Sequence, residues 1–177
     1  MAMPDIREFD ALQWLNGHFR GELSLSLEQL GPILCFSLIW NLFETRACGR
    51  HATQESIRRA VDHADESGRL EHSRYEPFLT FFQNRYQGRS SDETFRRLLM
   101  ENQTAQEMVR RALLGEAQDL NNKVYALLLI GHRVRNNLFH GNKEVGSLPR
   151  QTELFVAVNA LLATFLEDIE NFPQRSG

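Results

Sequence analysis

Cysteine is scarce in this sequence, and the paired spacing of a cysteine-rich metal site is missing. The 177 residues contain only Cys35 and Cys48. This count excludes a framework of disulfide bridges and a zinc site built on closely spaced cysteine pairs. We therefore expect two reduced thiols, as is usual inside the cell.

Long apolar runs are also missing. The longest one spans residues 33–43, well short of the roughly 20 residues that a bilayer-spanning helix needs. The amino-terminal segment, MAMPDIREFD, carries acidic residues where a secretory signal would need basic ones followed by a continuous apolar run. The sequence therefore predicts a cytoplasmic protein that does not cross a membrane.

The Val/Ile/Thr alternation of β-strands is absent, whereas apolar residues recur at spacings of three and four. We expect an all-α protein, a single-domain helical bundle over residues 1–177 with additional short helices. The expected helices cover about residues 5–19, 26–48, 53–68, 75–86 and 152–171, with short ones opening at capping boxes that start at Ser90 and Thr104. Another long helix starts at about residue 119 and reaches the stretch that begins at Arg133. Pro32 predicts either a kink in the second helix or a later start. The two longest internal apolar helices, which start near residues 26 and 119, and the last helix should form the centre of the bundle.

Common catalytic motifs are missing as well: the sequence has no glycine-rich phosphate loop, no G-x-S-x-G elbow and no H-E-x-x-H zinc helix. The acidic cluster at 62–66 includes His63, but its side chains point around a helix, which favours a solvated surface over a metal site. His18, His51 and His72 each stand alone near an expected helix end. We interpret them as terminal or loop residues.

Basic residues are dominated by arginine, 18 of 20, although the net charge is −3. Arginine is the side chain that holds phosphate or carboxylate with a planar fork of donors. Three similar segments, at 57–61, 95–99 and 109–113, each contain an Arg-Arg pair. In each, a glutamate stands four residues before an arginine, which favours surface ion pairs on helices over a repeated nucleic-acid patch. The expected pairs are Glu55–Arg59, Glu93–Arg97 and Glu107–Arg111.

The stretch RVRNNLFHGNKE, residues 133–144, follows an apolar helix and allows two interpretations. In the first, Gly141 is a left-handed C-cap, and Arg135 and His140 are cations favoured by the negative end of the helix dipole. In the second, the stretch is a functional site, because residues 120–143 contain basic residues and no acidic residue. The basic residues of this window are Lys123, Arg133, Arg135 and Lys143.

Arg135 and His140 are five residues apart, which separates them by roughly 140° on a regular helix. They can act together only if the helix breaks near Asn136 and Asn137, or if two chains bring their copies together. Asparagine has a low helix propensity, so two in a row make a local break plausible.

The segment from Arg135 to Gly141, RNNLFHG, resembles the R-x(4 to 6)-H motif of the HEPN superfamily, and most of all its Apea-like branch. The resemblance covers residues 133–143 and otherwise only the helical order, with the motif between the last two long helices. It implies a metal-independent endoribonuclease, often a toxin or a phage-defence effector, in which two protomers form one composite site. The branch whose tyrosine is modified by a partner enzyme differs here, because Asn142 takes that position.

The resemblance implies a role for each residue of the motif. His140 would act as the acid or base, Arg135 would hold the phosphate and Asn136 would orient one of them. The RNA contacts would come from Arg133, Asn137 and Lys143. The products would be a 2′,3′-cyclic phosphate and a 5′-hydroxyl, with no metal or other cofactor. A cognate antitoxin or regulatory partner is compatible with this class of protein.

A second hypothesis stays open from the sequence. The protein could be a non-catalytic helical dimer that serves as an adaptor, a neutralising partner or a nucleotide-binding module and keeps the motif for structure. Cleavage of RNA by the wild type, and its loss in Arg135→Ala or His140→Ala, would separate the two hypotheses.

Overall fold

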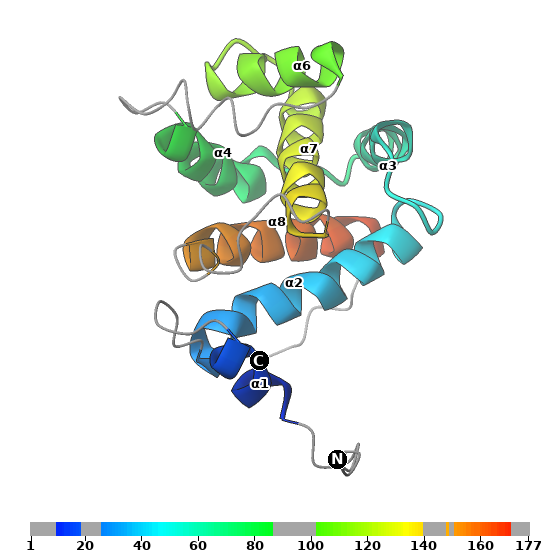
Figure 1. Cartoon of the computed structure of the whole chain (residues 1–177). Helices are drawn as coiled ribbons and strands as arrows, with labels where there is room; N and C mark the ends of the chain where they lie inside the picture. The colour runs from blue at the N-terminus through cyan, green and yellow to red at the C-terminus, as the bar shows by residue number, and fades with distance from the viewer. Residues whose placement is uncertain (1–9, 19–25, 87–101, 140–147, 149–150, 171–177) are drawn as a thin grey trace, which may run out of the picture.

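The computed structural model describes residues 10–18, 26–86, 102–139, 148 and 151–170. Within these ranges it contains seven helices and no strand, which confirms the all-α prediction (Figure 1). Their bounds are α1 (Ala11–His18), α2 (Leu27–Arg46), α3 (Gln54–Glu66), α4 (His72–Tyr86), α6 (Gln103–Leu113), α7 (Leu120–Phe139) and α8 (Thr152–Glu170). None of these helices combines the length and the apolar composition that a membrane span requires.

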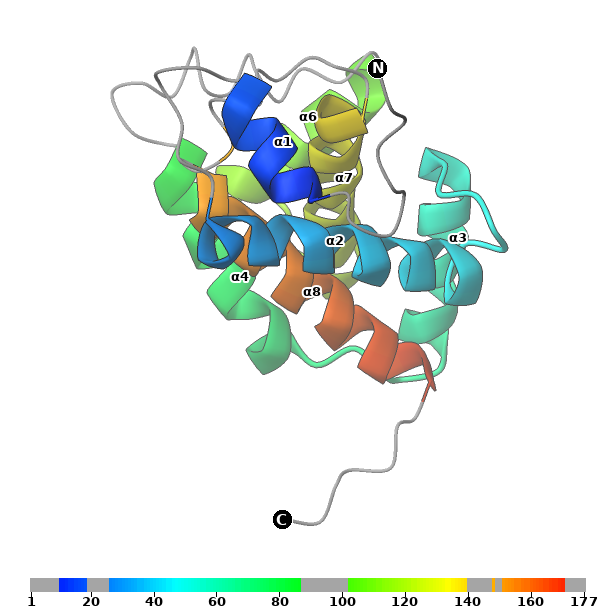
Figure 2. The same ribbon diagram turned by 60° about the horizontal axis from the view of Figure 1, so that its bottom comes forward.

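The core is one cluster of buried side chains from α2, α3, α4, α6, α7 and α8. Of the three helices predicted for its centre, α8 packs against both α2 and α7, whereas α7 also packs against α3, α4 and α6. α2 packs against α8 and crosses it obliquely in Figure 2, and α7 stands across α8 in Figure 1. Edge-on aromatic pairs join α2 to α8: the ring centroids of Phe36 and Phe155 are 5.4 Å apart and those of Phe43 and Phe165 are 6.0 Å apart. α7 approaches α8 closely at Gly131, where an added Cβ would lie 3.4 Å from Val158.

The second helix begins at its capping box and not at Pro32. The Ser26 hydroxyl accepts a hydrogen bond from the Gln29 N–H, and the Gln29 side chain accepts one from the Ser26 N–H. The later start considered for Gly31 and Pro32 is therefore wrong, and Pro32 lies inside the helix. The Pro32 carbonyl accepts a hydrogen bond of 2.8 Å from Asn159 Nδ2 of α8.

Caps fix the other boundaries, with one correction. Thr53 and Ser56 form the capping box of α3, and Gly115 follows α6 with the positive φ of +75° that glycine tolerates. The cap of α6 is Asn102, whose side chain accepts from the N–H groups of Thr104 and Ala105. The capping box predicted at Thr104 is wrong because a stronger cap residue stands two positions earlier. The box at Ser90 lies outside the described residues.

The surface ion pairs follow the same pattern. Glu55 and Arg59 form the expected pair at 3.3 Å. Glu107 instead pairs with Arg110, which is three residues away, and not with the predicted Arg111, which is four residues away. Arg110 donates two hydrogen bonds of 2.7 Å to Glu107. The predicted pair of Glu93 with Arg97 lies outside the described residues.

A polar cluster fastens α4 to α8. The carboxylate of Asp168, whose side chain is 1% exposed, accepts hydrogen bonds from Arg74 and from the hydroxyl of Tyr75. Arg74 also pairs with Glu167 at 2.6 Å. Burial raises the pKa of Tyr75 well above its usual range, so its hydroxyl stays a donor to Asp168. The donors and acceptors of this cluster satisfy one another.

Candidate functional site at the end of α7

The carboxyl-terminal end of α7 carries the described part of the candidate motif. The helix continues without interruption to Phe139, so the break considered near Asn136 and Asn137 does not occur. His140 and Lys143 lie outside the described residues, and their roles stay predictions.

Arg135 is held in place by its own helix. Its Nη1 donates to Asn136 Oδ1 at 3.3 Å, and its guanidinium carbon lies 5.5 Å from the centre of the Phe139 ring. The distance suits a cation–π contact. Its Nε is buried and has no hydrogen-bond partner among the described residues. The side chain is therefore positioned while part of its donor fork is unused.

Arg133 also has a buried nitrogen, its Nε, without a hydrogen-bond partner in the described part of the chain. The two arginines are two residues apart, so they point roughly 160° away from each other on the helix. Neither forms an ion pair with a carboxylate within the described ranges, unlike Arg74. Asn137 is half-buried on the last turn, beside this cationic end.

His132 is a member of the site that the sequence analysis did not select. It lies three residues before Arg135, about 60° away around the helix. Its ring centroid is 6.0 Å from that of Trp40 on α2. A search for ionisable residues three or four positions from Arg135 would have found it.

The pKa of His132 is lowered, mainly because the ring is buried. The Ala52 carbonyl and Glu44 oppose this change, whereas Arg135 and Arg133 reinforce it. Glu44 also accepts a hydrogen bond of 3.3 Å from the Ala52 N–H, which ties the loop after α2 to this corner. A neutral His132 keeps a third cation from forming beside the two arginines at neutral pH.

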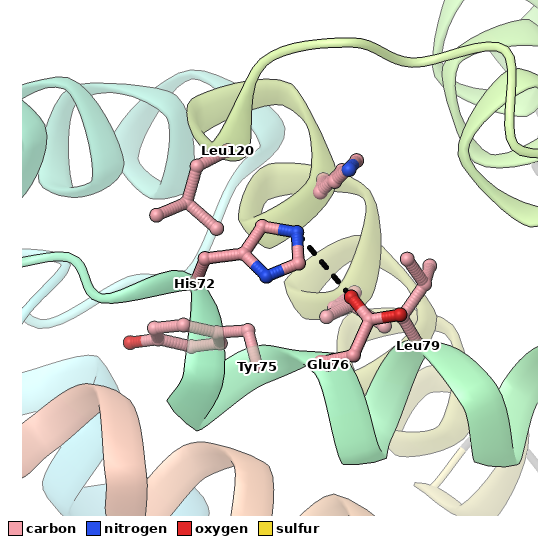
Figure 3. Close-up of a pocket in the computed structure, with 7 residues that line it drawn as sticks. His72, Tyr75, Glu76, Leu79 and Leu120 are labelled. Atoms are coloured by element: carbon pink, nitrogen blue, oxygen red, sulfur yellow. Dashed lines mark ion pairs between the residues drawn. The ribbon is translucent and has the colours of Figure 1, made fainter.

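A second histidine with a nearby partner, His72, lies on α4 beside the amino-terminal end of α7. His72, Tyr75, Glu76 and Leu79 of α4 line a shallow depression with Leu120, Lys123 and Leu127 of α7 (Figure 3). His72 Nε2 lies 3.3 Å from Glu76 Oε2. The contact is exposed on both sides, as expected for a histidine at a helix start. No group of three or more potential metal ligands occurs within the ranges that the structure describes.

The sequence was also compared with protein-family models, with curated proteins and with solved structures, and none of them matches the chain. The interpretation of the site thus depends on its residues and geometry.

Proposed function

We propose that this protein is a metal-independent endoribonuclease that acts as a homodimer, in the role of a toxin or phage-defence effector. The observation that carries the proposal is Arg135, a positioned guanidinium with an unpartnered buried Nε and no carboxylate partner among the described residues. A structural arginine is normally paired when buried. An arginine without a carboxylate partner, two residues from a second arginine, is suited to binding a phosphate.

The chemistry follows from these side chains. One His140 takes the proton of a ribose 2′-hydroxyl, whose oxygen attacks the neighbouring phosphorus, and the bond to the 5′-oxygen breaks. The His140 of the other chain gives a proton to that departing oxygen. Arg135 stabilises the added negative charge of the phosphorane, and Asn136 orients Arg135 through its amide oxygen. The reaction leaves a 2′,3′-cyclic phosphate and a 5′-hydroxyl, and it requires RNA because DNA lacks the nucleophile.

Two chains are needed because α7 does not break. With a regular helix through Asn136 and Asn137, the chain offers no local distortion within the described residues that would turn Arg135 toward position 140. A twofold axis that passes near the end of α7 brings the residues there close to their own copies, so that one chain supplies what the other cannot reach.

The test measures RNA cleavage with purified wild type, Arg135→Ala and His140→Ala in the presence of EDTA. Arg135→Ala should lower the rate by a factor on the order of 10²–10³, as for removal of one oxyanion-stabilising donor, and His140→Ala by 10²–10⁴, roughly the contribution of general acid–base catalysis. Arg59→Ala is the matched control, because Arg59 is exposed and paired with Glu55 on α3. RNA left intact by the wild type, or cleaved equally by His140→Ala, would overturn the proposal.

The pH dependence gives a second readout. Two copies of one histidine in opposite protonation states predict a cleavage rate that falls on both sides of neutral pH. A flat rate between pH 5 and 8 would exclude this mechanism even if RNA is cut.

One observation favours a second candidate, the non-catalytic helical dimer that acts as an adaptor, a neutralising partner or a nucleotide-binding module. α2 exposes several large leucines, which is typical of a surface that another protein covers. This function would leave RNA intact in the assay above while the chain still assembles.

A further inference from the structure

α2 carries a leucine stripe on its outer face, formed by Leu27, Leu34, Leu38 and Leu42. These side chains are 67%, 56%, 71% and 49% exposed with α1 in place. At about 100° per residue, Leu27, Leu34 and Leu42 all lie within roughly 40° of Leu38 around the helix axis. The four leucines therefore form one line about 22 Å long. Single exposed leucines are ordinary, but an aligned set marks an interaction surface.

The opposite face of α2 is already used. Ile33, Phe36, Trp40 and Phe43 are buried there, and α2 packs on α8 (Figure 2). A helix that is apolar on both faces is expected to be buried on both. On the outer face the four leucines stay at least 49% exposed, although α1 lies on that side of the amino-terminal half of α2 (Figure 1).

We propose that the leucine stripe binds the leucine stripe of a second copy of this chain, with the two α2 helices antiparallel about a twofold axis near residue 37. The charges of α2 fit this arrangement. Glu28 and Arg46 are both exposed and lie about 80° from Leu38 on the same flank. Their midpoint is residue 37, so an antiparallel pair places each Glu28 beside the Arg46 of the other copy. Arg46 also has an interaction within its own chain, so this pairing adds to an existing one.

The shape of the stripe is also self-complementary. Gly31 interrupts the line of leucines, and no atom lies within 4 Å of the Cβ that a side chain would place there. In an antiparallel pair centred at residue 37, Leu42 of one copy lies next to Gly31 of the other and fills this gap. Leu34 and Leu38 of the two copies then interdigitate across the axis.

The pairing connects to the α7 site, and this link rests on the proposed function. His132 lies near Trp40 and Glu44 of α2, on the flank opposite Glu28 and Arg46. A twofold axis perpendicular to α2 keeps corresponding flanks on the same side of the pair. Both α7 ends would therefore lie on the same side of the dimer, each behind its own α2 helix.

A membrane surface is a poorer occupant of the stripe. Amphipathic helices that lie on anionic lipid carry lysines and arginines along the polar face. The polar flanks of α2 instead contain Glu28 and Glu44 and a single basic residue, Arg46.

The first test measures the mass in solution by light scattering at micromolar concentration. The wild type should give 2 × 20.5 = 41 kDa, and Leu38→Glu should weaken dimerisation on the order of 100-fold or more, because the change is made in both copies. Leu114→Glu is the matched control, since Leu114 on the end of α6 is 51% exposed and off the stripe. A monomeric wild type, or a Leu38→Glu protein that stays dimeric, would overturn the proposal.

A charge swap tests the antiparallel direction. Glu28→Arg should weaken the dimer by a few fold, as for exposed ion pairs, and Glu28→Arg combined with Arg46→Glu should restore it. Lack of restoration would exclude this register. These surface changes should leave the thermal transition of the chain intact, which separates lost pairing from lost folding.

A native thiol reports the same geometry. Cys35 is exposed beside the stripe, whereas Cys48 is buried. Burial raises the pKa of Cys48 to about 11, so a short bismaleimide should react with Cys35 alone. Cross-linked dimer is expected for the wild type and not for Cys35→Ser or Leu38→Glu. Binding of monomers to anionic vesicles in place of cross-linking would assign the stripe to a membrane and overturn the proposal.

The two proposals fail separately. If Leu38→Glu stays dimeric while Arg135→Ala no longer cuts RNA, the stripe is not the interface and the nuclease stands. If Leu38→Glu is monomeric while wild-type protein leaves RNA intact, the stripe is the interface and the nuclease proposal is wrong.

Discussion

Two arginine-containing regions of the molecule differ in how their charges are satisfied. Between α4 and α8, Arg74 donates to Asp168 and Glu167, and Asp168 also accepts from Tyr75. At the end of α7, Arg133 and Arg135 each keep a buried Nε without a partner among the described residues. The first region uses its charges to join two helices. The second joins no helices through an ion pair within the described residues, and this separates it from the first region, the structural clamp between α4 and α8.

Removing the buried carboxylate of the clamp should have the largest effect on folding. Asp168→Ala leaves Arg74 and Tyr75 without their common acceptor, so we expect the free energy of unfolding to fall by about 3 kcal/mol. Glu167→Ala is the matched control, because Glu167 contacts the same Arg74 but is 57% exposed, and it should cost less than about 1 kcal/mol. Urea unfolding followed by circular dichroism measures both. Equal losses would mean that burial of Asp168 has no special weight.

The two arginines provide a direct comparison between the regions. Arg74→Ala leaves Asp168 buried and uncompensated, and should destabilise the protein by about 2 kcal/mol, with the guanidinium itself one-third exposed. Arg135→Ala removes no ion pair within the described residues and should change stability by less than about 1 kcal/mol. Urea titrations of both variants decide the point. A larger loss for Arg135→Ala would show that it is a structural arginine, against its proposed role in binding phosphate.

Titration of His132 at the α7 end should make the stability of the protein depend on pH under mildly acidic conditions. Because the pKa of His132 is lowered in the folded protein, the unfolded chain binds more protons as the pH falls below the usual value of about 6.5. The contribution of neutral His132 to the stability of the protein is therefore fully present above about pH 6.5. It is lost as the pH falls toward the pKa of His132 in the folded protein. His132→Gln should therefore reduce the loss of stability between pH 7.5 and 5.5.

The matched control for this titration is His51→Gln, since His51 is exposed in the loop after α2. Urea unfolding at the two pH values measures the difference for each variant. An unchanged pH dependence in His132→Gln would show that the buried ring does not titrate in this range.

Local signals predicted much of the fold. Thr53, Gly115 and Asp119 mark helix boundaries through hydrogen bonds and backbone angles that involve residues close in sequence. The misplaced cap at Thr104 shows the limit of such signals, because Asn102 offers a competing cap two residues earlier. The first residue of a helix depends on which of two neighbouring cap residues bonds to the free N–H groups, and the sequence alone does not decide between them.

Contacts between distant segments could not be predicted. Asp168 meets Arg74 across 94 residues, and no local pattern indicates that pair. The apolar pattern of α2 likewise predicts a core helix but does not tell that Leu38 faces outward. For the candidate site, the sequence indicated the cationic end of α7 and Arg135, whereas the approach of His132 to Trp40 depends on how α7 crosses α2.

The smallest expected effect tests whether the comparison between the two regions depends on burial. Arg59 forms the same kind of ion pair as Arg74, with Glu55 at 3.3 Å, but both side chains are at least 70% exposed. Solvent screens such a pair, and a helical pair of this spacing contributes only about 0.3–0.5 kcal/mol. Arg59→Ala should therefore leave the urea midpoint almost unchanged and lose its small effect in 1 M salt. A loss comparable to that of Arg74→Ala would mean that pairing itself, and not burial, is what separates a clamp arginine from the arginines of the α7 end.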